Sequence, residues 1–283
     1  MKTRTSSLDP KLILGIFIVL FIVSIAIFQP LLSKAIIGNH NPLNISLFPM
    51  YESPSLEHPL GTDRFGRDVL ALTLLSTRYS LVIGALAGVF STFIGILIGF
   101  TAGYKGGGAD TVLRTFTDAL LVIPSLPILM VLSAYVKTLN ILTMGIILAI
   151  FSWPYSSRVI RSQVMSLRES PYVDLAKLNN MKDYEIIFTE ILPNLLPFLG
   201  VSLAGSIVGA MVAATGLEVL GLGPSGITTL GMMINLAIGW GALSQGKWNL
   251  ILPPILVLVL LFVGVQLINM GLEATYNPRV RRQ

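Results

Sequence analysis

Six apolar segments, separated by polar stretches, dominate this sequence. A helix needs about 20 mostly apolar residues to cross the hydrocarbon core of a bilayer. Inside that core a helix satisfies its backbone hydrogen bonds within the segment, so helices are the expected structure. The segments lie roughly at residues 12–32, 79–103, 112–136, 139–156, 195–217 and 250–272. The sequence therefore predicts an all-α, polytopic membrane protein with about six transmembrane helices.

The composition agrees with a chain that lies mostly in lipid. Of its 283 residues, 53% are hydrophobic and 12% are charged, whereas soluble domains carry about twice that charged fraction. The absence of cysteine excludes disulfides, iron–sulfur clusters and zinc sites with thiolate ligands. The first apolar segment follows Lys2, Arg4 and Lys11. It is too long for a signal peptide and lacks a small-residue cleavage site, so we expect a retained anchor helix.

Lysine and arginine are distributed unevenly between the two sides of the predicted bundle. Six crossings place both termini on one side, together with the turn at 104–114 and a polar insert at 157–194. These segments hold thirteen of the nineteen basic residues, and cytoplasmic loops carry such an excess in membrane proteins. We therefore expect cytoplasmic termini and a cytoplasmic insert, with residues 33–78 and 218–249 outside. The alternative is a chance bias among few charges.

Glycines recur at four-residue spacing within two of the predicted spans. Such spacing lets helix backbones approach closely in lipid. We expect these glycines to pack helices within the chain; the alternative is an interface with another subunit. The glycines are Gly84, Gly88, Gly95, Gly99, Gly103, Gly205 and Gly209.

Prolines interrupt the third and fourth predicted spans. Because proline cannot donate a backbone hydrogen bond, Pro124 and Pro127 should break the third span and Pro154 should break the fourth. We expect kinks at these positions rather than moving hinges.

A few ionisable residues fall within or beside the spans. Asp118 lies inside the third span, where a charge is costly and suggests function. Arg114 lies one helical turn earlier, so an i,i+4 ion pair is the simpler expectation. Glu218 and Glu273 fall near span ends, where we expect water to reach them. The chain has no H-E-x-x-H motif, and we expect no metal and no other cofactor.

A helix-prone stretch runs from Ser166 to Pro197, through most of the polar insert. Ser170 and Pro171 predict a helix start, with a capping hydroxyl followed by proline at the first helical position. Asn179-Asn180 predicts its end, because asparagine tolerates a left-handed backbone. The helix should have one apolar and one charged face. The apolar face consists of Tyr172, Leu175, Ala176 and Leu178, and the charged face of Asp174 and Lys177.

A second helix should follow, so that the insert forms a helical hairpin. Pro193 and Pro197 should end this helix before the fifth span. The hairpin either rests among lipid headgroups as an amphipathic element, or docks its first helix into a cleft on a soluble partner. The apolar residues of the second helix are Ile186, Ile187, Ile191 and Leu192.

The insert resembles the EAA loop of ABC-importer permeases, in which E-A-A and a glycine precede I-x-L-P. Asp174-Leu175-Ala176 stands at the E-A-A position, and Asn180 stands at the glycine. Glu190-Ile191-Leu192-Pro193-Asn194 closes the motif. Aspartate, leucine and asparagine replace three of the usual residues, and asparagine can still form the turn at some backbone cost.

Other segments are similar to the dipeptide, oligopeptide and nickel branch of these permeases, in the expected order along almost the whole chain. The chain departs from the branch at Ala214, where several members carry a glutamate; Glu218 lies one helical turn later. It also has Leu230-Gly231 where Trp-Gly is expected. The matching segments are His58–Asp68, the pattern of Arg114, Asp118, Pro124 and Ser125, Leu220–Gly223, Gly271-Leu272 and Asn277-Pro278-Arg279.

The resemblance implies the fold of a type I ABC-importer permease in a prokaryotic plasma (inner) membrane. It implies a second homologous permease, two ATP-binding cassette ATPases and an extracytoplasmic substrate-binding protein as partners. Peptides are the implied substrate, with oligosaccharides or nickel as alternatives. Residues 1–78 would form an anchor helix and outer loop, and 79–283 the permease domain with its coupling insert at 157–194. A self-sufficient secondary carrier is the rival, but inverted repeats and paired midplane charges are not evident.

Two candidate sites follow from the resemblance. The coupling residues should receive force from an ATPase. They are Tyr172, Asp174, Leu175, Ala176, Lys177, Leu178, Asn179, Asn180, Met181 and Lys182. The outer-loop motif should either staple its loop through local ion pairs or orient it toward the delivery protein. It consists of His58, Pro59, Gly61, Thr62, Asp63, Arg64, Gly66, Arg67 and Asp68.

Two glycine patterns resemble nucleotide-binding motifs without the context that such motifs need. Gly61-x-x-x-x-Gly66 continues as Arg67-Asp68, so the lysine and hydroxyl of a P-loop are missing. Gly221-x-Gly223-x-x-Gly226 follows a predicted span instead of a strand. We therefore expect no enzyme activity in this chain, and any ATP hydrolysis in a partner.

Overall fold

A computed structural model of the chain describes residues 9–136 and 139–276. Helices make up most of these residues, and no β-strand occurs among them, which confirms the all-α class. Lys2, Arg4, Lys137 and the motif Asn277-Pro278-Arg279 lie outside the described residues.

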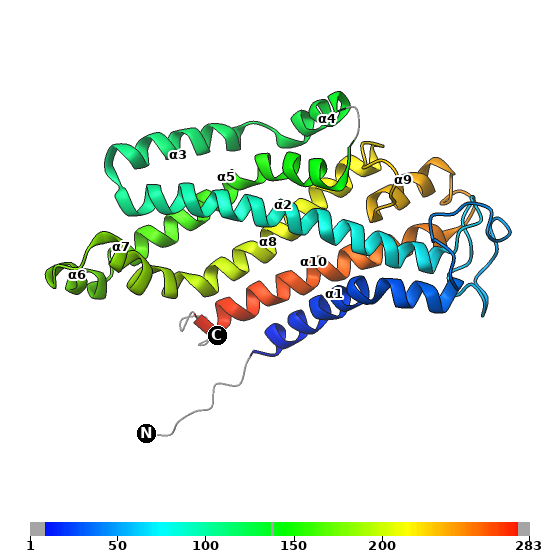
Figure 1. Cartoon of the computed structure of the whole chain (residues 1–283), viewed down its shortest axis with the longest axis horizontal. Helices are drawn as coiled ribbons and strands as arrows, with labels where there is room; N and C mark the ends of the chain where they lie inside the picture. Colours follow the sequence, from blue (N-terminus) through cyan, green and yellow to red (C-terminus); the bar gives the residue numbers. More distant parts are fainter. Residues whose placement is uncertain (1–8, 137–138, 277–283) are drawn as a thin grey trace, which may run out of the picture. The chain divides into compact units, whose positions relative to one another are not determined.

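The helices follow the order of the predicted spans (Figure 1). Their bounds are α1 Pro10–Ile37, α2 Val69–Lys105, α3 Gly107–Val122, α4 Ser125–Tyr135, α5 Ile141–Arg168, α6 Pro171–Leu178, α7 Asp183–Glu185, the π-helical turn η1 Ile186–Ile191, α8 Leu192–Val219, α9 Leu230–Gly239 and α10 Trp248–Tyr276.

Four helical stretches among the described residues are long and apolar enough to cross a membrane. They are α1, α2, the continuous run Asp183–Val219 and the part of α10 at Trp248–Leu272. The bent pair of α3 and α4 adds a fifth if it counts as one span. The predicted fourth span falls in the first half of α5, whose second half carries Arg158, Arg161 and Arg168. All six predicted segments therefore coincide with helices.

The predicted proline breaks are confirmed at only one position. The axes of α3 and α4 differ by 79°, and the chain bends at Pro124, which precedes α4 in an extended conformation. Pro127 lies in the first turn of α4, where a backbone N–H has no intrahelical partner in any case. Pro154 lies inside α5, which continues past it to Arg168. The predicted break of the third span is therefore confirmed, at Pro124, whereas the predicted break at Pro154 is wrong.

The described chain divides into two compact units. The first contains residues 9–82, 139–141 and 214–276, and the second contains residues 83–136 and 142–213.

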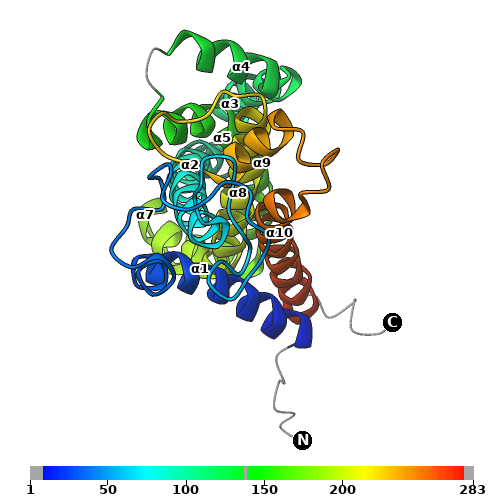
Figure 2. The ribbon, with the colours of Figure 1, turned by 90° about the vertical axis from the view of Figure 1, so that its right-hand side faces the viewer.

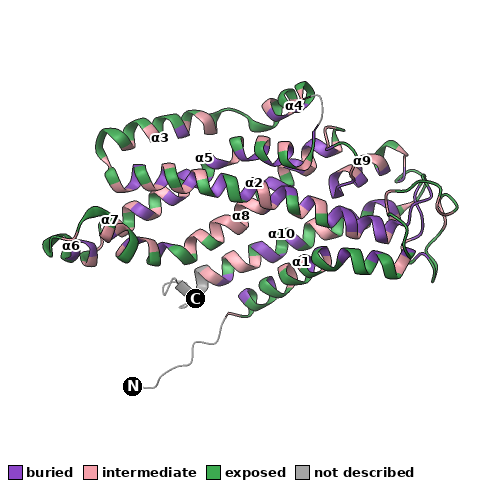
Figure 3. Ribbon diagram, viewed as in Figure 1, coloured by how far each residue is buried: buried purple, intermediate pink, exposed green. Residues whose placement is uncertain are grey.

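In the first unit, α1 runs beside α10 (Figures 1 and 2). A Cβ atom added to Gly15 of α1 would lie 2.6 Å from the carbonyl oxygen of Gly264, and one added to Gly271 of α10 would lie 2.6 Å from the backbone of Leu12. The two helices therefore meet at their backbones, as small residues permit. Figure 3 shows exposed residues along α1. Phe17 and Phe28 of this helix are both exposed, as expected of a helix with a lipid-facing side.

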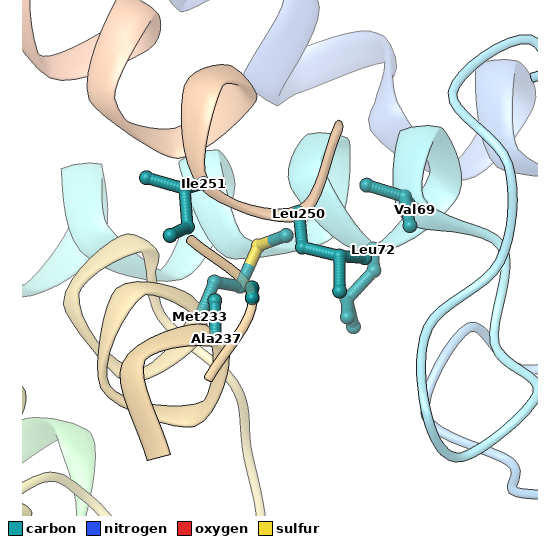
Figure 4. Packing of buried hydrophobic residues seen from close by; sticks show 7 residues of the cluster. Val69, Leu72, Met233, Ala237, Leu250 and Ile251 are labelled. Atoms are coloured by element: carbon teal, nitrogen blue, oxygen red, sulfur yellow. The ribbon is translucent and has the colours of Figure 1, made fainter. Parts of the chain in front are cut away.

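A buried apolar cluster fixes α9 in the first unit. Its side chains come from the first turn of α2, from α9 and the turn after it, and from the start of α10 (Figure 4). The loop before α2 packs against the same cluster through Leu43, Tyr51 and Leu60. The cluster contains Val69, Leu72, Met233, Ala237, Ala242, Leu250 and Ile251. The outer-loop motif is thus supported by three helices.

In the second unit, the predicted glycine contacts bring α2 against α5 and α8. Added Cβ atoms at Gly84 and Gly88 would meet Ile207 of α8. Added Cβ atoms at the other three α2 glycines would meet Ser156, Ser157, Arg161 and Val164 of α5. Packing within the chain is therefore confirmed for Gly84, Gly88, Gly95, Gly99 and Gly103. Gly205 and Gly209 have no heavy atom near an added Cβ, so they do not pack in this way.

Gly99→Ala should destabilise the α2–α5 contact. The new methyl group would lie 2.5 Å from the carbonyl oxygen of Ser157 and 3.1 Å from the amide nitrogen of Arg161. Both neighbours are backbone atoms, so the helices must separate, at a cost of about 1–3 kcal/mol. We expect a lower thermal unfolding midpoint in detergent micelles. Gly205→Ala, which adds the same methyl group to open space, is the matched control; equal midpoints for the two variants would contradict this packing.

Candidate functional site

The insert forms a compact helical hairpin, defined here as residues 171–191. Its first helix, α6, begins as predicted, with Ser170 in an extended conformation and Pro171 at the first helical position. The carbonyl oxygen of Ser170 accepts hydrogen bonds from the amides of Val173 and Asp174. The Ser170 hydroxyl does not cap the helix; it donates to the carbonyl oxygen of Ser166 at 3.3 Å. The predicted capping hydroxyl is therefore wrong.

The apolar residues of α6 lie on two faces instead of one. Val173 and Ala176 are buried, whereas Leu175 and Leu178 are 61% and 78% exposed. The prediction of a single apolar face that unites Ala176 with the two leucines is therefore wrong. Asp174 forms an exposed pair with Lys177 at 3.4 Å. The outward surface of α6 thus combines two free leucines with a small charged pair.

Asn180 ends α6 as the sequence predicts. Its φ angle is +56°, in the left-handed region where the family pattern has glycine. The amide of Asn180 donates to the carbonyl of Lys177, and the amide of Met181 donates to the carbonyl of Ala176. These two bonds form a Schellman motif. The turn that the resemblance implies is therefore made by asparagine in this chain.

The second half of the hairpin is continuous with the long helix that follows. The run from Asp183 through η1 to Val219 is unbroken, so the prediction that Pro193 and Pro197 end the helix is wrong. The amide of Leu192 donates to the carbonyl of Ile187, five residues back. Pro193 follows directly, where hydrogen bonding changes from the π to the α pattern and a missing N–H is tolerated.

A small apolar core holds the hairpin together and joins it to neighbouring helices. Its buried members are Val173, Ala176, Ile186 and Ile191. Side chains from the ends of α2 and α5 pack against it, together with side chains of the hairpin itself: Phe100, Tyr104, Leu167, Tyr172 and Met181. Because the core uses the inner face of α6, Leu175 and Leu178 are not needed for the hairpin's own fold. They remain available to a partner.

The outer-loop motif is a self-contained network of buried polar groups. Nη2 of Arg67 lies 2.6 Å from Oδ2 of Asp63, and both side chains are less than a tenth exposed. Nδ1 of His58 lies 2.8 Å from Oδ2 of Asp68. The other oxygen of Asp68 accepts the backbone N–H of Ala71 in the first turn of α2. Of the local ion pairs that the sequence suggests, the Asp63–Arg67 pair is present and is buried.

The rest of the outer-loop motif supports this network. The Thr62 hydroxyl donates to the carbonyl of Pro49 at 2.6 Å and accepts the N–H of Glu52. Gly61 and Gly66 have φ angles of +73° and +67°, and carbonyl oxygens occupy the space where their Cβ atoms would be. Pro59 and Arg64 are exposed. Most of the motif therefore faces inward.

Of the ionisable residues in or beside the spans, Asp118 has the expected partner, whereas Glu218 is more buried than expected. The expected Arg114–Asp118 pair is present at 3.4 Å and is exposed. Glu218 is only 1% exposed and lies beside Thr229 and Gly231 in the first unit. The expectation that water reaches Glu218 is therefore wrong, because the chain after α8 folds back over it. The side chain of Glu273 is outside the described part of the chain.

Two cross-helix contacts in the second unit have no signal in the sequence. Arg161 of α5 forms a two-pronged ion pair with Asp110 of α3. The Tyr104 hydroxyl of α2 donates to Asp183 at 2.8 Å. The partners are 51 and 79 residues apart, so no local spacing connects them. Among the described residues, no group of three or more His, Cys, Asp or Glu side chains could hold a metal ion.

The chain superposes on a structure of the MetNI methionine ABC transporter in an inward-facing conformation, with a TM-score of 0.54. The superposition covers 71% of this chain and 96% of that chain, at 18% sequence identity. The fold is that of a type I ABC-importer permease.

Residues 95–282 match the family model described as "Binding-protein-dependent transport system inner membrane component". The chain belongs to this family and is a multi-pass membrane permease of an ABC importer. Membership implies a substrate-binding protein and ATPase partners.

Individual relatives cover most of the chain. The oligopeptide transport system permease protein OppC of Bacillus subtilis (strain 168) is 29% identical over 95% of this chain and 85% of its own length. OppC of Mycobacterium tuberculosis (strain ATCC 25618 / H37Rv) is 34% identical over 82% and 79%, respectively. The dipeptide transport system permease protein DppC of Bacillus subtilis (strain 168) is 29% identical over 95% and 82%.

Proposed function

We propose that this chain forms half of a translocation pathway for dipeptides or oligopeptides and couples it to cytoplasmic ATPases. The relatives named for oligopeptide and dipeptide transport support the substrate class. The coupling role is supported chiefly by the outward surface of α6. Leu175 and Leu178 are exposed there on a helix that is held by a core of its own.

The partners follow from this role. A second, homologous permease would complete the pathway, and two ATPases would bind beneath, one on each hairpin. The hairpin and both termini would then lie in the cytoplasm. The chain itself would hydrolyse no ATP and act as no enzyme. Residues 1–78 would add an anchor helix and outer loop to the permease domain at 79–283.

In this mechanism, movement of the ATPases is transmitted through the hairpins to the translocation pathway. ATP binding closes the ATPase pair, and the hairpins move with it. Rigid helices then switch the pathway between inward-open and outward-open states. Within the coupling residues, the buried Ala176 and the turn at Asn180 would fix the shape of the hairpin. The exposed leucines would contact the ATPase.

The outer-loop motif would serve a different partner. Its buried ion pairs would keep the loop rigid beneath a surface that meets the extracytoplasmic binding protein. The exposed Pro59 and Arg64 are the motif residues that could reach that protein. The outer loop would then have both the structural role and the contact role that the sequence leaves open.

Substrate class is tested on the substrate-binding protein that works with this chain. Calorimetric titration with a dipeptide, a pentapeptide, a maltooligosaccharide and Ni²⁺ should show tight binding only for peptides. Tight binding of nickel alone would indicate a nickel importer, and tight binding of the sugar alone would indicate an oligosaccharide importer. Purification of the tagged chain from its native membrane should bring the ATPases and the second permease with it. A self-sufficient carrier would be recovered alone.

A further inference from the structure

The C-terminal end of α2 is tied to the hairpin by one specific side-chain contact. Tyr104 is the penultimate residue of α2, and its hydroxyl donates to Oδ1 of Asp183 at 2.8 Å. Asp183 is the first residue of α7. The Tyr104 ring packs against the hairpin's apolar core and stacks on Phe100, one turn earlier in α2. The ring therefore approaches the hairpin with both its apolar surface and its hydroxyl.

The last residue of α5 holds the same end of α2. Nη1 of Arg168 donates to the carbonyl oxygen of Tyr104 at 3.0 Å. A cation that binds a free carbonyl at a helix C-terminus stabilises that terminus. Gly106 gives Arg168 room, because a Cβ atom at Gly106 would lie 2.8 Å from this Nη1. Tyr104 is thus held through its backbone by α5 and through its side chain by α7.

A polar recess of about 630 Å³ opens beside the Tyr104–Asp183 contact. Its lining includes Lys105, Glu169 and Lys177 as well as the two contacting residues. Because no side chains fill this space, apolar packing covers only part of the contact between α2 and the hairpin. On the side of the recess, the hydrogen bond from Tyr104 makes the connection.

The connectivity of the chain shows why this connection matters. The hairpin is covalently continuous with α5 before it and with α8 after it. When the hairpin moves, the adjoining ends of those two helices must move too. α2 ends more than 60 residues before the hairpin begins, so it can follow only through non-covalent contacts.

We propose that Tyr104 is a positioning residue that makes α2 follow the hairpin, through its hydrogen bond to Asp183. The inference rests on the proposed coupling role of the hairpin and deepens it. Without the hydroxyl, α5 and α8 would still respond to the ATPases, whereas the response of α2 would weaken. Tyr104 would then add α2 to the two helices that the hairpin moves directly.

The natural absence of cysteine allows a direct test. Thr101→Cys places a thiol on an exposed position of α2, and Asn194→Cys places one on an exposed position of α8. The rate of maleimide labelling is measured on the full assembly, with and without ATP and vanadate. Tyr104→Phe should reduce the nucleotide-induced change at Thr101→Cys about fivefold, the equilibrium factor that one hydrogen bond supports. The change at Asn194→Cys should persist.

Tyr184→Phe is the matched control. Tyr184 follows Asp183 directly and is exposed, and its hydroxyl contacts the neighbouring Glu185 instead of α2. It should leave both labelling responses unchanged. A merely structural role for Tyr104 would lower the yield of the assembly without separating the two responses.

Two results would overturn the inference in distinguishable ways. Equal nucleotide responses of Thr101→Cys in the Tyr104→Phe and Tyr184→Phe backgrounds would remove the role of Tyr104 alone. No nucleotide response at Asn194→Cys with Tyr104 intact would remove the coupling role of the hairpin, and this inference with it.

Discussion

Leu175→Asp combined with Leu178→Asp should abolish ATP-driven uptake while leaving the chain inserted and folded. Both leucines project from the outward face of α6, and neither belongs to the hairpin's core. Their replacement therefore costs the isolated chain little. In a cleft of the ATPase, each unpaired carboxylate would lose its hydration, at a cost of several kcal/mol of binding. Together the two charges should prevent docking.

The measurement has two parts. ATPase recovered with the tagged permease should fall to background, and substrate uptake by reconstituted vesicles should be lost. Val173→Asp is the contrasting variant, because Val173 is fully buried in the hairpin core. It should lower the thermal unfolding midpoint, which the leucine variant should leave unchanged. Persistent ATP-driven uptake with both leucines replaced would rule out this surface as the coupling contact.

Asp63→Ala should give the largest loss of stability in the outer loop. It removes the carboxylate that pairs with the buried guanidinium of Arg67, as well as the acceptor for the N–H groups of Phe65 and Arg67. Breaking a buried ion pair by removing one partner costs about 3–5 kcal/mol, because the remaining charge is left uncompensated.

Arg64→Ala provides the control for the outer loop, since Arg64 is exposed and adjacent in sequence. Its effect should stay within about 0.5 kcal/mol. Thermal unfolding of the purified variants in the same detergent compares the two directly. Similar midpoints for Asp63→Ala and Arg64→Ala would mean that the outer-loop motif does not hold the loop as the structure indicates.

Local patterns predict the helices of this protein well. Segments long enough to cross a bilayer form helices because lipid offers no hydrogen-bond partners to their backbone groups. The helix end at Asn180 was predictable in the same way. A residue with a left-handed backbone ends α6, and asparagine tolerates that conformation. The glycines of α2 were informative because close helix contact needs small residues wherever the partner helix lies.

The predictions that were wrong concern properties that depend on distant parts of the chain. Pro154 and Pro197 remain inside helices because packing offsets the loss of one hydrogen bond. The faces of α6 were misassigned because apolar residues occupy both sides of an eight-residue helix, and only the core shows which side is inner. Glu218 is buried by a loop that follows it. Local spacing carries no information on such contacts.

Reconstitution shows whether transport by this chain depends on force from ATPase partners. Uptake of a labelled peptide is measured in proteoliposomes that contain this chain, the second permease and the binding protein, with and without the two ATPases. Mechanical coupling through the hairpin predicts uptake only when the ATPases are present and ATP is supplied. Uptake by this chain without any nucleotide hydrolase would contradict it.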